Sequence, residues 1–321
     1  PDFVELHGRK WYVVQGVDSM PPFLMSIVSD GDRWMFVSSS GGVTAGRRDI
    51  AGSLFPYETD DRLHHLGGLN GPVTTIRLAR DDAPWRPMVG PTTEHRSRTL
   101  YKSVMGDSVM FEERDSATGL TFRYRWTSSD RFGFIRTATL ANEGNEARAV
   151  ELTDGLRNIL PHGLDPSLYL PMGNLTNAYK RSELIDGELR MAVYSLESLM
   201  TDRPEPQQAM RATVAWSVGL DDASVSLDPD STTSAVTHRD LDRPLVTGMP
   251  GAYFLRSGID LESGQAETWS IVADVGLDQP RLMSLLERLH SLDDRPDVLA
   301  SSASAASQSL LEIVARADAM Q

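Results

Sequence analysis

Cysteine is absent from the 321-residue sequence. Its absence excludes disulfides, thiolate catalysis and cysteine-ligated zinc or iron–sulfur sites. A reducing cytoplasm is the simplest setting for such a chain, so we expect a cytoplasmic, bacterial protein, although secreted bacterial proteins can also lack cysteine. Lysine is also scarce, because Lys10, Lys102 and Lys180 are the only ones, and arginine supplies most of the positive charge.

Positive charge and long apolar segments are in short supply. The chain has 31 lysines and arginines against 45 acidic residues, which gives a net charge of −14. This charge repels phosphate backbones and no basic cluster offsets it, so we expect no nucleic-acid partner. No run of about 18 apolar residues occurs, so we also expect no membrane-spanning segment and no membrane partner.

Local catalytic and metal-binding motifs are missing as well. There is no Gly-x-Ser-x-Gly elbow, no phosphate-binding loop and no dinucleotide fingerprint. His64 and His65 are adjacent, and on a strand their side chains would point to opposite faces, so we expect no metal site. Paired carboxylates for hydrolysis stay open, because acidic residues are abundant, but abundance identifies no particular pair.

Alternating side chains predict strands through most of the chain. Phe122, Tyr124 and Trp126 alternate with Arg123 and Arg125, so the aromatic and charged side chains fall on opposite faces. The aromatic residues could form a stacking platform for sugar rings. We favour a core position for them, with both arginines exposed, because large aromatic side chains dominate buried sandwich faces.

The other expected strands are short and separated by turn residues. An Asp186-Gly187 pair predicts a tight two-residue turn in one hairpin. The predicted strands are Arg33–Ser40, Val73–Arg80, Val109–Glu113, Leu120–Ser128, Phe132–Ala141, Ala147–Leu156, Ser182–Ile185, Glu188–Tyr194, Arg211–Leu220, Ala223–Leu227, Gly251–Ile259 and Glu267–Val275. This order predicts a mainly β protein, built as a large antiparallel β-sandwich.

Two C-terminal α-helices are expected after the strands. Asp278 can cap the first helix, which has Pro280 in its first turn. The second can run from residue 297 towards residue 318. Its Leu310, Ile313 and Val314 should form an exposed apolar stripe that needs a partner, either further chain or a second copy in a homodimer.

The segment Ser38–His65 is the most unusual part of the sequence. It combines a turn containing Gly41, Gly42 and Gly46, which would let the backbone approach a ligand closely, with a dense set of polar side chains. The candidate sugar-binding residues are Arg47, Arg48, Asp49, Tyr57, Asp60 and Asp61. The aromatic face that a sugar requires could come from Trp34, Phe55 or Tyr57. The alternative interpretation is a surface loop whose charges satisfy one another.

Three segments carry a family resemblance. Ser38–Asp61 has a serine- and glycine-rich turn, then the pair Arg48-Asp49 and an aromatic–acid run. Val109–Leu156 has two paired strands, and Leu310–Gln321 has the form of a connecting helix. Together they resemble the N-terminal region of the inverting glycoside phosphorylases, which include cellobiose and chitobiose phosphorylases and the phosphorylase-like end of cyclic β-1,2-glucan synthases.

The resemblance implies a β-supersandwich of the galactose-mutarotase type, two linker helices and then an (α/α)6 catalytic barrel. Residues 1–275 would form the supersandwich and residues 276–321 the linker, and the barrel would follow. In that family the general acid lies in the barrel and phosphate is the attacking group. We therefore expect no catalytic residue and no cofactor here, with phosphate a co-substrate of the parent enzyme only.

The preferred interpretation is a non-catalytic accessory domain that braces the catalytic barrel of a phosphorylase-like or hydrolase-like enzyme. Its expected partners are this barrel and an oligosaccharide or small sugar. One alternative is a free-standing carbohydrate-binding module. A second is a sugar epimerase of the mutarotase type, which would need two histidines and a carboxylate on the concave sheet.

Overall fold

The computed structural model describes residues 2–6, 8–78, 83–169, 172–198, 210–231 and 243–318. Most of these residues lie in strands. The strands are β1 (Asp2–Leu6), β2 (Arg9–Gln15), β3 (Leu24–Ile27), β4 (Arg33–Ser38), β5 (Val43–Arg47), β6 (Gly71–Leu78), β7 (Arg96–Ser103), β8 (Val109–Asp115), β9 (Leu120–Ser129), β10 (Gly133–Asn142), β11 (Arg148–Ile159), β12 (Lys180–Asp186), β13 (Met191–Leu196), β14 (Arg211–Val218), β15 (Ser224–Ser226), β16 (Leu245–Thr247), β17 (Gly251–Leu261) and β18 (Ala266–Asp278).

Helical elements are short in the body of the chain and long at its C-terminal side. They are η1 (Val17–Ser19), η2 (Ile50–Gly52), α1 (Asp60–Leu63), α2 (Pro166–Tyr169), α3 (Gly173–Asn177), α4 (Gln279–His290) and α5 (Arg295–Asp318). The last strand therefore ends, and the first long helix begins, within three residues of the position that the sequence predicted.

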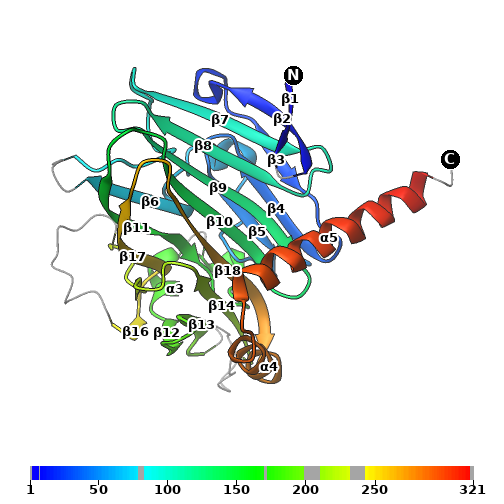
Figure 1. The fold of residues 1–321 in the computed structure, drawn as a ribbon. Coiled ribbons are helices and arrows are strands. Elements are labelled where there is room, and N and C mark those ends of the chain that lie inside the picture. The colour runs from blue at the N-terminus through cyan, green and yellow to red at the C-terminus, as the bar shows by residue number, and fades with distance from the viewer. Residues whose placement is uncertain are drawn as a thin grey trace.

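The strands form three antiparallel sheets. The large sheet has eleven strands in the order β1-β2-β7-β8-β9-β10-β18-β14-β13-β12-β16, and its long diagonal strands fill Figure 1. A second sheet has the order β15-β17-β11-β6, and a third is formed by β3, β4 and β5. The prediction of a mainly β, large antiparallel sandwich is confirmed.

The core lies between the large sheet and the two smaller ones. Phe122, Tyr124 and Trp126 on β9 are all buried in it, together with Trp269 from β18. The aromatic stripe is thus core, as expected from strand alternation, and not a stacking platform. Arg123, on the opposite face of β9, is only partly exposed, because it is paired with Glu112 of the neighbouring strand.

A buried charged cluster ties the two main sheets together. Arg136 on β10 and Asp154 on β11 are both fully buried, with 2.6 Å between Arg136 Nη1 and Asp154 Oδ2. Asp154 also accepts hydrogen bonds from Thr74 Oγ1 at 2.6 Å and from Trp269 Nε1 at 2.6 Å. The guanidinium lies 4.7 Å from the ring centroid of Tyr124. These partners compensate the loss of hydration of both charges.

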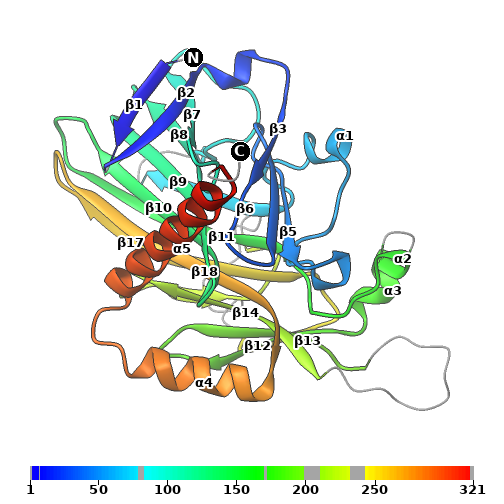
Figure 2. The ribbon, with the colours of Figure 1, turned by 90° about the vertical axis from the view of Figure 1, so that its right-hand side faces the viewer.

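The outer face of the large sheet is covered by α4 and α5 (Figure 2). Asp278 caps α4 as predicted, because its carboxylate accepts a hydrogen bond from Arg281 N at 3.0 Å. On α5, Leu299 and Leu310 pack against the sheet and are buried. Burial of Leu310 corrects the expected exposed stripe.

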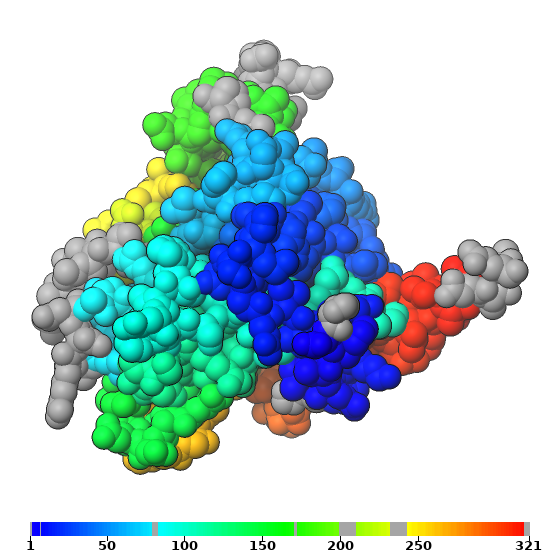
Figure 3. Space-filling view, turned by 90° about the horizontal axis from the view of Figure 1, so that it is seen from above, coloured from blue at the N-terminus to red at the C-terminus, as the bar shows by residue number. Residues whose placement is uncertain are grey.

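The last turns of α5 extend past the sheet. Ile313 is 49% exposed and Val314 is 40% exposed, and Figure 3 shows the red helix projecting from the body of the protein. The spacing of residues 299, 303, 306, 310, 313 and 317 is that of one continuous helix face. The same face that is buried on the sheet therefore continues into solvent.

Within Arg295–Ala317 an 18-residue stretch has a mean hydropathy of 1.2 and is 11% buried, so by length and composition alone this helix could cross a membrane. The sequence analysis, which considered only unbroken apolar runs, did not anticipate this. A single helix of this kind is weak evidence for a membrane-spanning segment. In the structure α5 is attached to the sheet, since Ser307 Oγ accepts a hydrogen bond from Arg9 Nη2 at 2.8 Å and donates one to Asp107.

The hairpin between β12 and β13 differs from the sequence prediction. In place of a two-residue turn at Asp186-Gly187, the chain makes a longer turn with Arg190 at φ 51°. The Asp186 carboxylate accepts hydrogen bonds from Leu189 N at 2.8 Å and contacts His290 of α4 at 2.7 Å. These bonds favour the longer turn over the tight one.

Candidate functional site

Two glycines bring the ends of the Ser38–His65 segment together. A Cβ on Gly42 would lie 2.2 Å from Leu63 O, and a Cβ on Gly67 would lie 2.3 Å from Ser40 O. Only glycine allows backbones to approach this closely. The glycine-bearing turn therefore packs against its own chain at the end of α1, and the expectation that it approaches a ligand is wrong for Gly42.

His64 is held in place by both ring nitrogens. Its Nδ1 lies 2.8 Å from Ser38 Oγ, and its Nε2 lies 3.1 Å from Asp60 Oδ1. Ser40 Oγ donates to the backbone carbonyl of His64 at 2.8 Å. This set of bonds fixes the turn after β4 against α1.

The three side chains Ser38, His64 and Asp60 have the composition of a serine-hydrolase triad but not its accessibility. Ser38 is fully buried, so no substrate carbonyl can reach its Oγ. Its hydroxyl is also shared with Ser40 Oγ at 2.8 Å. We assign this group a positioning role only.

An open cleft of about 470 Å³ lies beside this junction. Five segments line it: η1 and the residues after it, the turn after β4, the segment after α1, the segment between β6 and β7, and β7 itself. The polar lining residues are Asp18, Ser39, Ser40, His64, His65, Thr92 and Arg98, and the apolar ones include Val17, Met20, Pro22, Met88 and Pro91. This volume is within the range of about 300–1,000 Å³ typical of small-molecule sites.

His64 and His65 both line this cleft, which corrects the expectation that their side chains point to opposite faces. The reason is that they follow α1 in a turn and do not lie on a strand. His65 is exposed, and its side chain has no hydrogen-bond partner among the described residues. Among those same residues no group of three or more His, Asp or Glu side chains is arranged to hold a metal ion.

A buried ion pair supports the wall formed by the β6–β7 segment. Arg98 Nε donates to Glu113 Oε2 at 2.6 Å. Glu113 is fully buried and also accepts from Trp85 Nε1 and Met88 N, each at 2.7 Å. Because Glu113 binds three donors at once, it fixes the position of residues 85–90 relative to β7 and β8.

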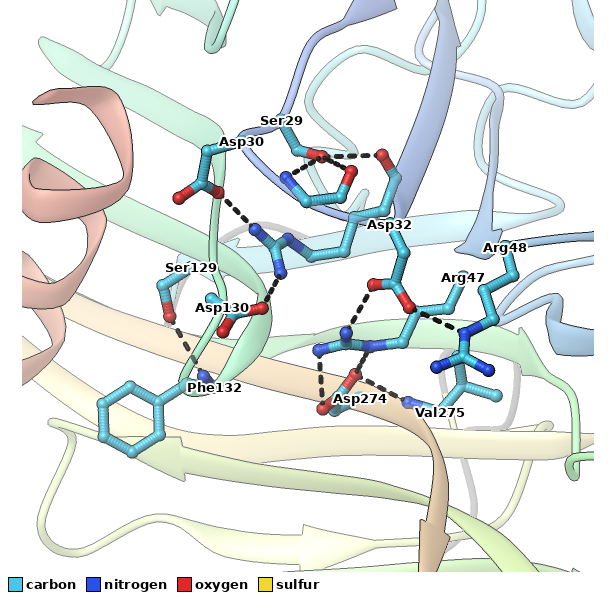
Figure 4. A network of polar contacts seen from close by, with 12 residues as sticks. Ser29, Asp30, Asp32, Arg47, Arg48, Ser129, Asp130, Phe132, Asp274 and Val275 are labelled. Atoms are coloured by element: carbon cyan, nitrogen blue, oxygen red, sulfur yellow. Dashed lines mark hydrogen bonds and ion pairs between the residues drawn. The ribbon is translucent and has the colours of Figure 1, made fainter. Parts of the chain in front are cut away.

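The predicted site residues Arg47 and Arg48 lie in a different place, at the junction of β5 with the large sheet (Figure 4). Arg47 Nε lies 2.6 Å from Asp274 Oδ1, and Arg47 Nη1 lies 2.7 Å from Asp32 Oδ1. Arg48 Nε reaches the other oxygen of Asp32 at 3.2 Å, and its side chain is 75% exposed.

Burial is the main influence on the Asp274 carboxyl in this junction. It raises the pKa of Asp274, and the adjacent Arg47 guanidinium offsets only part of this effect. The pKa of Arg47 itself is raised, because Asp274 and Asp32 together outweigh its own burial. Arg47 thus uses its guanidinium within the protein, as the alternative interpretation of the loop supposed.

The other four predicted residues lie elsewhere in the segment. Asp49 caps η2 by accepting from Gly52 N at 3.1 Å. Tyr57 is 39% exposed, and its ring centroid lies 5.9 Å from that of Trp34. Phe55 is fully buried and cannot offer a face to a sugar, which corrects that part of the prediction.

Asp60 and Asp61 lie in the first turn of α1. Asp60 contacts His64, and a hydrogen bond from Thr59 lowers the pKa of Asp61. In the described part of the chain the cleft lining contains none of the six predicted residues, and only Asp60 touches it indirectly, through His64. The sequence analysis missed Asp18, Thr92 and Arg98 because no local motif connects them.

No protein-family profile and no curated protein sequence matches the chain. Among solved structures, a polysaccharide lyase is similar over 83% of this chain and 34% of its own, at 12% identity and a TM-score of 0.42. A protein named as a kojibiose phosphorylase from the human microbiome is similar over 75% of this chain and 26% of its own, at 11% identity and a TM-score of 0.40.

A protein named as an aldose 1-epimerase of Escherichia coli K12 is similar over 80% of this chain and 100% of its own, at 8% identity and a TM-score of 0.39. The chain thus spans about a third of the lyase and a quarter of the phosphorylase, but the full length of the epimerase. Similarity at this level carries no argument about activity, which has to come from the chain's own residues.

Proposed function

We propose that this chain is a non-catalytic, sugar-binding accessory sandwich of a glycoside-phosphorylase-like or hydrolase-like protein. The observation that carries the proposal is the cleft, where exposed polar groups lie beside apolar surface. Hydroxyl groups of a sugar need such donors and acceptors, and its C–H faces need apolar contacts. The Ser38–His65 segment takes part through its two ends, Ser39–Ser40 and His64–His65.

The second element of the proposal is the surface of α5. Ile313 and Val314 continue the face that is buried on the sheet, so they suit packing against a helix of the catalytic barrel. A second copy of the chain is the other candidate for this surface. The exposed part of α5 covers about two helical turns. Its surface area is therefore small compared with the roughly 800 Å² that each partner buries in a standard interface.

The cellular setting completes the proposal. The protein would work in the cytoplasm, without a cofactor, a nucleic acid or a membrane, and phosphate would enter only as co-substrate of the parent enzyme. The cysteine-free sequence and its charge of −14 support this setting.

Isothermal titration with a panel of neutral glucans and disaccharides tests the sugar site. We expect binding that is weakened by His65→Ala, because His65 lines the cleft and its side chain has no other hydrogen-bond partner among the described residues. Arg48→Ala and Tyr57→Ala serve as controls from the other part of the loop. The opposite pattern, with binding lost only in these two variants, would move the site to Arg47–Asp61.

A mutarotase-type epimerase is the second candidate function. The observation that favours it is the presence of two histidines and a carboxylate, Asp18, around one cleft. Against it, both ring nitrogens of His64 are already bonded within the protein. Polarimetry on freshly dissolved aldoses separates the candidates, since an accessory domain leaves the spontaneous rate of anomer exchange unchanged.

A further inference from the structure

The Arg98 side chain in the cleft donates hydrogen bonds to its own chain from each of its three guanidinium nitrogens. Arg98 Nε donates to Glu113 at 2.6 Å, Nη1 donates to Gly90 O at 2.8 Å, and Nη2 donates to Val89 O at 3.4 Å. All three nitrogens therefore face the protein. Three of the five N–H donors of Arg98 are used in this way and the side chain is 10% exposed, so little of its guanidinium is accessible for the paired hydrogen bonds by which arginine recognises carboxylates and sulfates.

A carboxylate, in contrast, faces the cleft. Asp18 is exposed at η1 and accepts a hydrogen bond from Oγ1 of Thr92, which belongs to the segment between β6 and β7. This is the one hydrogen bond to the Asp18 side chain among the described residues. Two neighbouring hydroxyls of a ligand could replace the Thr92 hydroxyl and bind both carboxylate oxygens, whereas an anionic ligand would be repelled.

Apart from the imidazoles of His64 and His65, the remaining lining is apolar or uncharged. Met20 and Met88 offer flexible apolar surface, and Ser39 and Ser40 offer hydroxyls. Space of about 470 Å³ suits one or two sugar rings better than a longer polymer held along its length.

We infer that the cleft binds a neutral saccharide of one or two rings and excludes uronates and sulfated sugars, with Asp18 as the residue that discriminates. This inference rests on the proposed sugar-binding function and adds the class of ligand. It sets this site apart from one that selects acidic polysaccharides, which would need a free arginine or lysine in the cleft.

The test is isothermal titration of the whole chain with cellobiose and with the matching disaccharide that carries a uronic acid at its non-reducing end. We expect the neutral sugar to bind about tenfold more tightly, because a like charge would approach Asp18 closely. Titration at about 1 M salt, where the Debye length falls to about 3 Å, removes the contribution of the overall negative charge and retains that of Asp18.

Asp18→Asn is the discriminating variant. We expect it to weaken cellobiose binding about fivefold, through loss of a charged acceptor, and to reduce the preference over the uronate to about twofold. Asp293→Asn is the matched control, because Asp293 is exposed between α4 and α5 and changes the net charge equally. Thermal unfolding of both variants confirms that the fold is retained.

The outcomes separate the two proposals. If no saccharide binds at all, the proposed function and this inference both fail. If the uronate binds as tightly as cellobiose, sugar binding stands and the exclusion of acidic sugars is wrong. If Asp18→Asn behaves as Asp293→Asn does, another residue discriminates and the role of Asp18 is overturned.

Discussion

The Ser38–His65 segment contributes to two polar regions that look alike in sequence and differ in the structure. At the junction, Arg47 binds Asp32 and Asp274, so its charge is used within the protein. At the cleft, His65 and Asp18 are exposed and have few partners. The comparison teaches that charges clustered in the sequence can bind one another within the protein, whereas the polar groups with few partners lie around the cleft, where we propose that a sugar binds.

The strongest test of this distinction is the fully buried cluster in which both Nη atoms of Arg136 bind Asp154. Asp154→Ala leaves the buried Arg136 guanidinium without its carboxylate and removes the acceptor of Trp269. We expect the free energy of unfolding to fall by about 3–5 kcal/mol in urea denaturation. The double variant Arg136→Met/Asp154→Leu should recover most of this loss; a loss as large as that of the single variant would show that the charges themselves are required.

The junction should show the same behaviour with a smaller effect. In Arg47→Ala the Asp274 side chain, which is 15% exposed, loses two hydrogen bonds to a charged partner. We expect a loss of about 2 kcal/mol in stability and no change in sugar affinity measured on the folded protein. A loss of affinity without a loss of stability would place Arg47 in the binding site after all.

Lys180 is an intermediate case, a buried cation whose hydrogen-bond acceptor among the described side chains is the Asn177 amide, at 2.7 Å. Burial lowers its pKa from 10.5 to about 8. Between these two values the unfolded chain binds the proton and the folded chain does not, so stability should rise as pH increases from about 8 to about 10.5, by up to about 3 kcal/mol.

Urea denaturation across this pH range measures the rise. In Lys180→Met the Lys180 contribution to the slope disappears, and stability below pH 8 should increase because no charge is buried there. Equal slopes in the two proteins would mean that Lys180 stays hydrated in the folded state.

The smallest effect is expected at the exposed edge of the junction. Arg48 is 75% exposed and makes one ion pair at 3.2 Å. Arg48→Ala should change stability by no more than about 0.5 kcal/mol, because solvent screens exposed pairs. A change above 1 kcal/mol in thermal unfolding would show that the pair with Asp32 matters more to the junction than its exposure indicates.

The parts of the fold that depend on neighbouring residues could be predicted from sequence. The alternation of Phe122 with Arg123 gave the two faces of β9, and Asp278 with Pro280 gave the start of α4, because strand pleat and helix capping act over a few residues. The prediction of a two-residue turn at Asp186-Gly187 was wrong, because the turn depends on a contact that lies beyond its neighbouring residues. The Asp186 carboxylate contacts His290, more than a hundred residues away.

The candidate site was harder to predict because it is assembled from five segments of the chain. Nothing near Asp18 in the sequence indicates that Thr92 lies opposite, and the buried pair that holds this wall joins Arg98 to Glu113 across two strands. Arg47 and Arg48 were predicted as sugar-binding residues because they are neighbours in the sequence. Only the structure showed that Asp274, 227 residues further on, already binds Arg47.

The attachment of α5 to the sheet restricts how another protein can pack against the part of the helix that extends past the sheet. Ser307 and Leu310 fix the rotation of the helix about its axis, so Ile313 and Val314 point in one set direction relative to the strands. One residue inserted after Leu310 would turn that direction by about 100° and advance it by only about 1.5 Å. The direction in which this face of α5 points, more than the length of the helix, would therefore determine the orientation of the sandwich relative to a protein that packs against Ile313 and Val314.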